Sequence, residues 1–159
     1  MLILNTGGTF NKKYNPITGE LYVPSDNSAI EKIIASLCVN IRIHGIFHKD
    51  SLEMDEGDRS QLCEEIVNAK EEIVFVVHGT DTMDQSAVKV AQLGLDKTVV
   101  FTGAMIPFTV DPIEATANLA MAIGYATNCK SGVYIVMQGV CGEYDTIIKN
   151  KAVGKFEYV

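Results

Sequence analysis

The sequence predicts an α/β fold, in which a mostly parallel β-sheet forms the middle of three layers, between two layers of helices. Strand-like and helix-like segments alternate along the chain, as they do in consecutive βαβ units. Three of the strand-like segments are almost continuously apolar, which is typical of strands covered on both faces. The 159 residues, of which 47% are hydrophobic and 21% charged, are expected to form one domain over residues 1–159.

Short apolar runs predict the strands, and they cover residues 2–5, 39–47, 73–77, 98–102 and 132–137. Between the first two runs, the stretch Asn15-Pro16-Ile17-Thr18-Gly19 is a turn signal, so residues 10–23 are expected to form a flexible β-hairpin or loop. After Met137 the pattern changes. Residues 139–142 are expected to be a loop, and residues 145–159 to be irregular and to end in a short strand.

Apolar residues at helical spacing predict helices over residues 27–37, 57–70, 84–93 and 111–126. The third helix is expected to turn Ala87, Val88 and Ala91 toward the sheet. The fourth has the clearest start, Asp111-Pro112-Ile113-Glu114. Aspartate can cap a helix, proline suits the first helical position, and the glutamate can reach back as in a capping box.

Charge and composition argue against several partners and locations. The net charge is −7 and no cluster of Lys and Arg occurs, so we expect neither nucleic acid nor a membrane surface as partner. The apolar runs are too short to cross a bilayer and no signal-peptide pattern is present, which predicts a cytoplasmic protein. The four cysteines form no C-x-x-C pair, and His44 and His48 have no third ligand, so we expect reduced thiols and no metal.

Two threonine-bearing turns are the candidate functional residues. Asn5-Thr6-Gly7-Gly8-Thr9 follows the apolar run Leu2-Ile3-Leu4, and His78-Gly79-Thr80-Asp81-Thr82-Met83 follows the run at residues 73–77. If both runs are parallel strands of one sheet, both turns leave its carboxyl edge, where α/β sheets bind ligands. Hydroxyls, exposed N–H groups and one carboxylate would then line a pocket for a small polar molecule.

Other interpretations of these turns are open at this point. A glycine-rich turn can bind phosphate, but neither G-x-G-x-x-G nor G-x-x-x-x-G-K-[ST] occurs. Asp81 could be only a helix N-cap. His78 is expected to end a strand and to form local hydrogen bonds rather than to act in catalysis.

Five motifs together resemble the L-asparaginase/glutaminase family, specifically its larger N-terminal domain. They are Thr6-Gly7-Gly8-Thr9, Asp50-Ser51-Leu52-Glu53-Met54, His78-Gly79-Thr80-Asp81-Thr82-Met83, Thr102-Gly103-Ala104-Met105-Ile106-Pro107 and Asn118-Leu119. The resemblance covers essentially the whole chain. It implies a Rossmann-like or flavodoxin-like sheet with helices on both faces and an N-terminal flap hairpin.

The resemblance also implies an activity and its residues. Members of this family hydrolyse the side-chain amide of asparagine or glutamine and release ammonia, without a metal or an organic cofactor. By motif, Thr9 resembles the nucleophile, and Thr80, Asp81 and Lys149 resemble a second catalytic group. Lys149 is placed by its distance from the strand-like residues 133–137, and a solvent-exposed surface lysine is the alternative.

The implied substrate-binding residues are Gly8, Ser51, Gly79 and Ala104. Ser51 resembles the residue that holds the α-carboxylate of the substrate, and Asp81 would also take its α-ammonium. A tyrosine from the flap completes the family's site. Tyr22 fits by its spacing from Thr9, and Tyr14 is the rival.

The chain departs from the family pattern at Leu52, where a polar residue is common, and at Ile106, where a basic one is common. The resemblance does not include the family's smaller C-terminal domain, which contributes to the dimer interface and to the neighbouring site. We therefore expect a more open pocket in a homo-oligomer or beside a separate partner chain. The alternative is an inactive module that binds a small amino acid or amide; a nucleotide-binding domain is the third interpretation.

Overall fold

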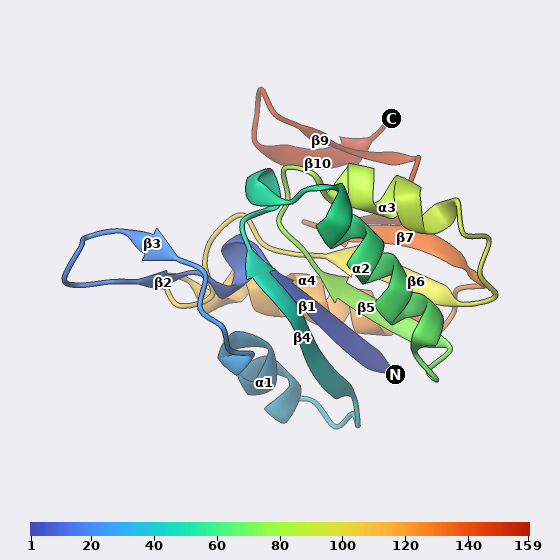
Figure 1. Ribbon diagram of the computed structural model, residues 1–159, viewed down its shortest axis with the longest axis horizontal. Coiled ribbons are helices and arrows are strands. Elements are labelled where there is room, and N and C mark those ends of the chain that lie inside the picture. Colours follow the sequence, from blue (N-terminus) through green and yellow to red (C-terminus); the bar gives the residue numbers. More distant parts are fainter.

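A six-stranded sheet flanked by helices organises the computed structural model, which describes residues 1–159 (Figure 1). The helices are α1 (Ser28–Ala35), α2 (Glu56–Asn68), α3 (Met83–Ala91) and α4 (Pro112–Ala126), with short 3₁₀ turns η1 (Thr9–Asn11) and η2 (Ser51–Glu53). The strands are β1 (Leu2–Gly7), β2 (Lys13–Tyr14), β3 (Leu21–Tyr22), β4 (Arg42–Lys49), β5 (Ile73–Val77), β6 (Thr98–Thr102), β7 (Gly132–Met137), β8 (Val140–Glu143), β9 (Ile147–Asn150) and β10 (Lys155–Tyr158).

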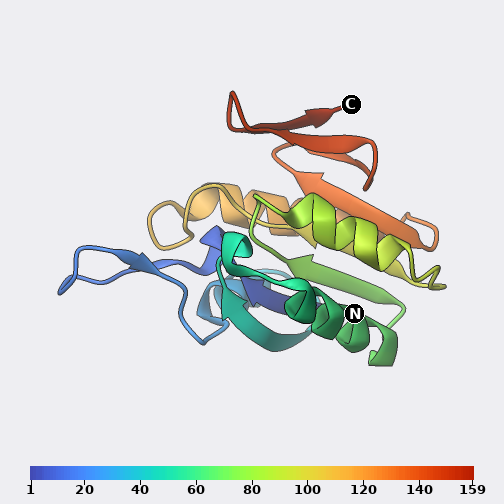
Figure 2. The same cartoon turned by 45° about the horizontal axis from the view of Figure 1, so that its top comes forward.

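The sheet has the order β4-β1-β5-β6-β7-β8, and all pairs from β4 to β7 are parallel. Apolar residues from both of its faces form two separate cores. Helices α1 and α4 pack on one face, and α2 and α3 on the other (Figures 1 and 2). Burial on both faces explains why β5 and β6 consist almost entirely of apolar residues. The predicted three-layer α/β fold is confirmed.

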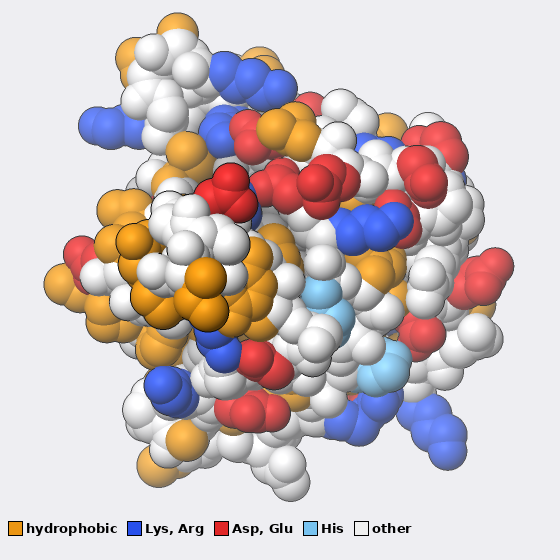
Figure 3. All heavy atoms as spheres, turned by 60° about the vertical axis from the view of Figure 1, so that its left-hand side comes forward, with side chains coloured by type: hydrophobic (Ala, Val, Ile, Leu, Met, Phe, Trp, Pro, Cys, Tyr) orange, Lys and Arg blue, Asp and Glu red, His pale blue; other side chains and the backbone are white.

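The β2–β3 hairpin is the predicted flap, and it projects away from the sheet (Figures 1 and 2). Its base is held on one side by an ion pair between Lys13 and Asp26 (2.8 Å). On the other side the Thr109 hydroxyl donates to the Lys12 carbonyl oxygen (2.9 Å). Hydrophobic side chains gather on the face that Figure 3 shows, and the exposed ones of the hairpin include Tyr14, Ile17 and Tyr22.

The region after Met137 differs from the prediction. Residues 140–143 are not a loop but β8, which pairs antiparallel with β7 across a tight turn. The turn residues Gln138 and Gly139 both have positive φ, 51° and 90°, as two-residue hairpins require. Glutamine at such a position gives no sequence signal. The segment that follows is a hairpin of two strands, β9 and β10, rather than irregular structure with one strand.

Two local predictions about helices are also corrected. Val88 is exposed, because the buried positions of α3 follow the helical repeat from Met83 through Ala87 to Val90. Glu114 does not close a capping box at the start of α4. Its carboxylate accepts the N–H groups of Met105 and Ile106 (3.0–3.1 Å) and so holds the loop after β6.

No helix combines the length and the apolar character needed to cross a membrane. All four cysteines are free thiols; Cys63 is buried and Cys38 is exposed.

Candidate active site

The two threonine turns lie side by side at the carboxyl edge of the sheet. Strands β1 and β5 are parallel neighbours, with Asn5 opposite Val77, so both turns start at the same level. Their glycines touch: a Cβ atom built on Gly8 would lie 2.5 Å from both the Cα and the N of Gly79. Thr9 and Thr80 each follow one of these two glycines, and the predicted juxtaposition of the turns is therefore present.

Gly8 is required for this close approach. Its φ is +72°, a conformation that side chains disfavour, and a Cβ atom would meet backbone rather than a movable side chain. We expect Gly8→Ala to lower the free energy of unfolding by more than about 3 kcal/mol, from backbone strain together with overpacking. Urea unfolding measures this.

Gly94→Ala is the matched control for that substitution. Gly94 has φ +59°, but a Cβ atom added there would have no other atom within 4 Å. The substitution should therefore lower the free energy of unfolding only by the backbone strain, about 1 kcal/mol. Equal losses in the two variants would show that the contact with Gly79 does not constrain Gly8.

Lys149 joins the second turn from the β9–β10 hairpin. Its Nζ donates to Thr80 Oγ1 and to Asp81 Oδ1, both at 2.8 Å. The lysine side chain is only 12% exposed, so the alternative of a solvent-exposed surface lysine is wrong. Asp81 is not the N-cap of α3, because Thr82 occupies that position. Thr80, Asp81 and Lys149 thus form one hydrogen-bonded group.

Ser51 lies directly beneath the second turn. A Cβ atom on Gly79 would fall 2.6 Å from Ser51 Oγ, and the Thr82 hydroxyl donates to the Ser51 carbonyl oxygen (2.9 Å). The Ser51 hydroxyl itself is buried without a hydrogen-bond partner. A buried hydroxyl without a partner has a hydrogen bond still to donate, which a polar ligand group beside the second turn could accept.

An ion pair between Lys12 and Asp50 (2.6 Å) lies next to Ser51. Burial alone would raise the pKa of Asp50. The hydrogen bonds from Lys12 and from the Leu52 N–H, with the nearby charges of Lys12 and Lys149, hold the pKa below its usual value instead. Asp50 is therefore a carboxylate at neutral pH, and it also caps η2.

His78 supports the second turn from inside the protein. Its Nδ1–H donates to the Gly79 carbonyl oxygen (2.7 Å), which leaves Nε2 to accept from the Ser86 hydroxyl (2.8 Å). Complete burial lowers the pKa of His78 to about 4, so the ring is neutral at pH 7. The prediction of local hydrogen bonds at a strand end is confirmed.

Two predicted residues lie apart from this group. Tyr22 is about half exposed on the projecting hairpin, and so is its rival Tyr14; neither takes part in the hydrogen bonds around Lys149. The Ala104 side chain is fully buried in the core beside α4, so only its backbone could reach a ligand.

The sequence did not indicate three residues that shape the site. Thr82 anchors Ser51, Lys12 pairs with Asp50, and Asn5 binds the Gly7 N–H with its side-chain oxygen. Thr82 and Asn5 lie within the two threonine turns, which could have suggested them. Lys12 and Asp50 are 38 residues apart and left no local signal.

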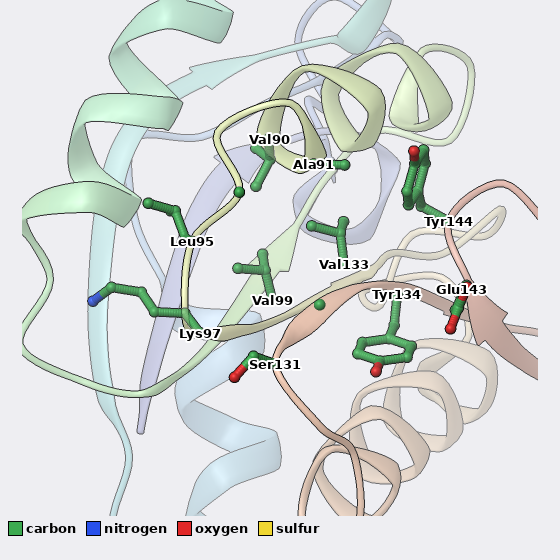
Figure 4. A pocket seen from close by; sticks show the side chains of 12 residues that line it. Val90, Ala91, Leu95, Lys97, Val99, Ser131, Val133, Tyr134, Glu143 and Tyr144 are labelled. Carbon is green, nitrogen blue, oxygen red and sulfur yellow. The ribbon is translucent and has the colours of Figure 1, made fainter.

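One cavity lies beside the Thr80–Asp81–Lys149 group, and a larger one lies at the opposite, amino end of the sheet. A cavity of about 210 Å³ is lined by Thr80, Asp81 and Lys149 together with apolar residues of β7, β9 and β10. A larger hollow of about 400 Å³ opens at the amino end of the sheet, among Val90, Val99 and other residues (Figure 4). That hollow is remote from both threonine turns. No three His, Cys, Asp or Glu side chains are placed to hold a metal ion.

Comparison with known families identifies the domain. The family model described as "Asparaginase, N-terminal" matches residues 1–156. The chain therefore belongs to the asparaginase family and corresponds to its N-terminal domain.

Individual relatives are more distant and longer. The chain is 27% identical over 148 residues to a subunit of the glutamyl-tRNA(Gln) amidotransferase of Pyrococcus abyssi, covering 89% of this chain and 34% of that protein. It is 29% identical over 155 residues to the same amidotransferase subunit of Methanococcus vannielii, covering 93% and 35%. The chain thus spans about a third of the length of these curated relatives.

Solved structures share the fold. The thermostable L-asparaginase from Thermococcus kodakarensis superimposes with a TM-score of 0.86 at 22% identity. The "probable cytoplasmic L-asparaginase" from Campylobacter jejuni gives 0.76 at 23% identity. Each comparison covers 99% of this chain and 50% of the other.

Proposed function

We propose that this domain is an asparaginase-like amidohydrolase that uses Thr9 as nucleophile on the side-chain amide of asparagine, glutamine or a related small amide. One observation carries the proposal: the Thr80–Asp81–Lys149 group lies on the turn that touches the Thr9 turn. A hydroxyl, a cation and a carboxylate at the carboxyl edge of the sheet are the groups that amide hydrolysis needs.

The chemistry follows from these groups. Thr9 Oγ attacks the amide carbon and its hydroxyl proton passes to the amide nitrogen. The C–N bond then breaks and the nitrogen leaves as ammonia, so that an ester remains on Thr9. Water then hydrolyses the ester and releases the acid. Because Lys149 donates to Thr80 Oγ1, the hydroxyl hydrogen of Thr80 is free to point toward substrate or water.

Substrate binding would use the neighbouring polar atoms. Asp81 offers Lys149 only its Oδ1, so Oδ2 can accept the α-ammonium of an amino acid. The unpartnered hydroxyl of Ser51 would donate to the α-carboxylate, and the Gly8 and Gly79 backbones would line the pocket. Tyr22 would reach Thr9 by movement of the β2–β3 hairpin. No cofactor is part of this scheme.

The proposed working form is a homo-oligomer or a complex with a separate partner chain. Thr9 is partly accessible, and the surface of a neighbouring chain would limit the access of bulk water to it. The curated relatives are themselves named as subunits of an amidotransferase.

The direct test is ammonia release by the purified chain from asparagine, glutamine and a panel of small amides. The double variant Thr9→Ala/Thr80→Ala sets the background. Turnover above this background is expected for at least one amide, and turnover equal to it for every amide would refute the proposal.

A second candidate is an inactive binding module for a small amino acid or amide. It is favoured by Leu52, whose side chain is 71% exposed and apolar beside Ser51. Calorimetry with aspartate and asparagine distinguishes the candidates, because binding without ammonia release supports the module. Absence of both binding and turnover contradicts both candidates.

Ser51→Ala is expected to raise KM or Kd by about 10- to 100-fold, because a hydrogen bond to a charged group contributes roughly 1.5–3 kcal/mol. The free energy of unfolding should change by less than about 1 kcal/mol, since the hydroxyl has no partner in the free protein. Titration and urea unfolding of the same preparation measure both quantities. A large loss of stability with unchanged affinity would assign Ser51 a structural role.

A further inference from the structure

The end of β1 carries a buried amide that contacts both the Thr9 turn and the base of the β2–β3 hairpin. Asn5 is fully buried and is the last residue of β1 in regular register with both neighbouring strands. Between Asn5 and Gly7 the register with β4 shifts, so the chain leaves the sheet irregularly here. Such a bulge leaves backbone groups that need other partners.

The side-chain oxygen of Asn5 accepts two hydrogen bonds from the Thr9 turn. It accepts the Gly7 N–H (2.9 Å) and the Asn11 amide (2.8 Å). The Asn11 amide also donates to the Gly7 carbonyl oxygen (3.0 Å). Because Gly7 precedes Gly8 and Asn11 ends η1, these bonds enclose Thr9 from both sides along the chain. Gly7 and Gly8 both have positive φ, so the turn needs such bonds to keep one conformation.

The side-chain nitrogen of Asn5 donates hydrogen bonds to the segment that follows the hairpin. It donates to Asn27 Oδ1 (2.8 Å) and, at 3.4 Å, to the Asp26 carbonyl oxygen. Asp26 follows β3 and forms the ion pair with Lys13 that closes the hairpin base. One planar amide, with an acceptor at one end and two donors at the other, therefore joins the Thr9 turn to the hairpin.

We propose that Asn5 is a positioning residue that sets the place of the Thr9 hydroxyl and couples it to the β2–β3 hairpin. Its side-chain hydrogen bonds go to Gly7, Asn11, Asp26 and Asn27, and none goes to Ser51, Thr80, Asp81 or Lys149, so its loss should affect the reaction step more than binding. The kinetic part of this inference rests on the proposed function. A misplacement of about 1 Å at the reacting group can cost roughly 100-fold in rate.

Asn5→Ala is therefore expected to lower kcat by about 100-fold while KM stays within about threefold. Asn5→Asp keeps an oxygen acceptor for Gly7 and Asn11, and it should recover about tenfold of the lost kcat. Asn11→Ala removes two of the bonds and is the milder substitution should Asn5→Ala fail to fold. It should lower kcat by roughly tenfold.

Thr98→Ala is the control for lost stability alone. Thr98 is buried at the amino end of the sheet, where its hydroxyl donates to the Lys130 carbonyl oxygen (3.1 Å). It should shift the urea midpoint downward and leave kcat within about threefold. If Asn5→Ala and Asn11→Ala also leave kcat within about threefold while shifting the midpoint, Asn5 is only structural and the proposal is wrong.

Hydrogen exchange provides a readout that does not depend on catalysis. Asn5→Ala should speed exchange in residues 7–11 and 13–27 together, whereas Thr98→Ala should not. If the wild-type chain releases no ammonia but this joint change occurs, the coupling stands and the proposed function fails. Unchanged exchange in either segment overturns the coupling.

Discussion

Thr9→Ala is expected to lower kcat for ammonia release by about 10³-fold or more, with a much smaller change in KM. The substitution removes the oxygen that would form the ester, whereas the proposed binding side chains, Ser51 and Asp81, belong to other turns. The other threonine of the same motif cannot take over, because the Thr6 hydroxyl is buried and donates to the Val77 carbonyl oxygen (3.0 Å). Steady-state ammonia release measures the effect.

Thr9→Ser is the control for this substitution, since it keeps the hydroxyl and should retain activity within about tenfold. A Thr9→Ala variant with wild-type turnover would contradict the assigned nucleophile. In that case Thr80 would be the remaining hydroxyl next to a cation.

Lys149→Met is expected to lower kcat by about 10²- to 10³-fold. The substitution removes the positive charge next to Thr80 and Asp81 and keeps most of the buried stem. Thr80 would lose the donor that orients its hydroxyl, and Asp81 the cation that fixes its carboxylate. Comparison of kcat and KM for the best amide provides the measurement.

Lys155→Met is the matched control, because Lys155 lies on β10 of the same hairpin and is exposed. It should leave kcat within about twofold. Equal losses in the two lysine variants would mean that charge on the hairpin in general matters, rather than the bonds that Lys149 forms.

The elements predicted with the correct bounds are the ones whose signal is local. The strands at residues 73–77, 98–102 and 132–137 are apolar runs that end at glycine or polar residues, and β5, β6 and β7 match them. Strands β8 and β9 were missed because they lie at the margin of the fold, and one depends on Gln138 with positive φ.

The residues of the candidate site also differ in whether a local sequence signal predicts them. Thr9 and Thr80 could be placed together because each follows a buried strand, and parallel neighbours end at the same edge. Lys149 was reached only through the family resemblance, since it is 68 residues from Asp81. Asn5 and its partner Asn27 are 22 residues apart, and buried amides look alike in sequence until their partners are known.

The position of Lys149 on the β9–β10 hairpin has a consequence for how the protein is made. A ribosome delivers the chain from its amino end, so the strands that carry both threonine turns emerge well before residues 147–158. Until that hairpin docks, Thr80 and Asp81 lack their cation. A nascent chain can thus complete the β1–β5–β6 part of its sheet before the β9–β10 hairpin docks and places the Lys149 ammonium beside Thr80 and Asp81.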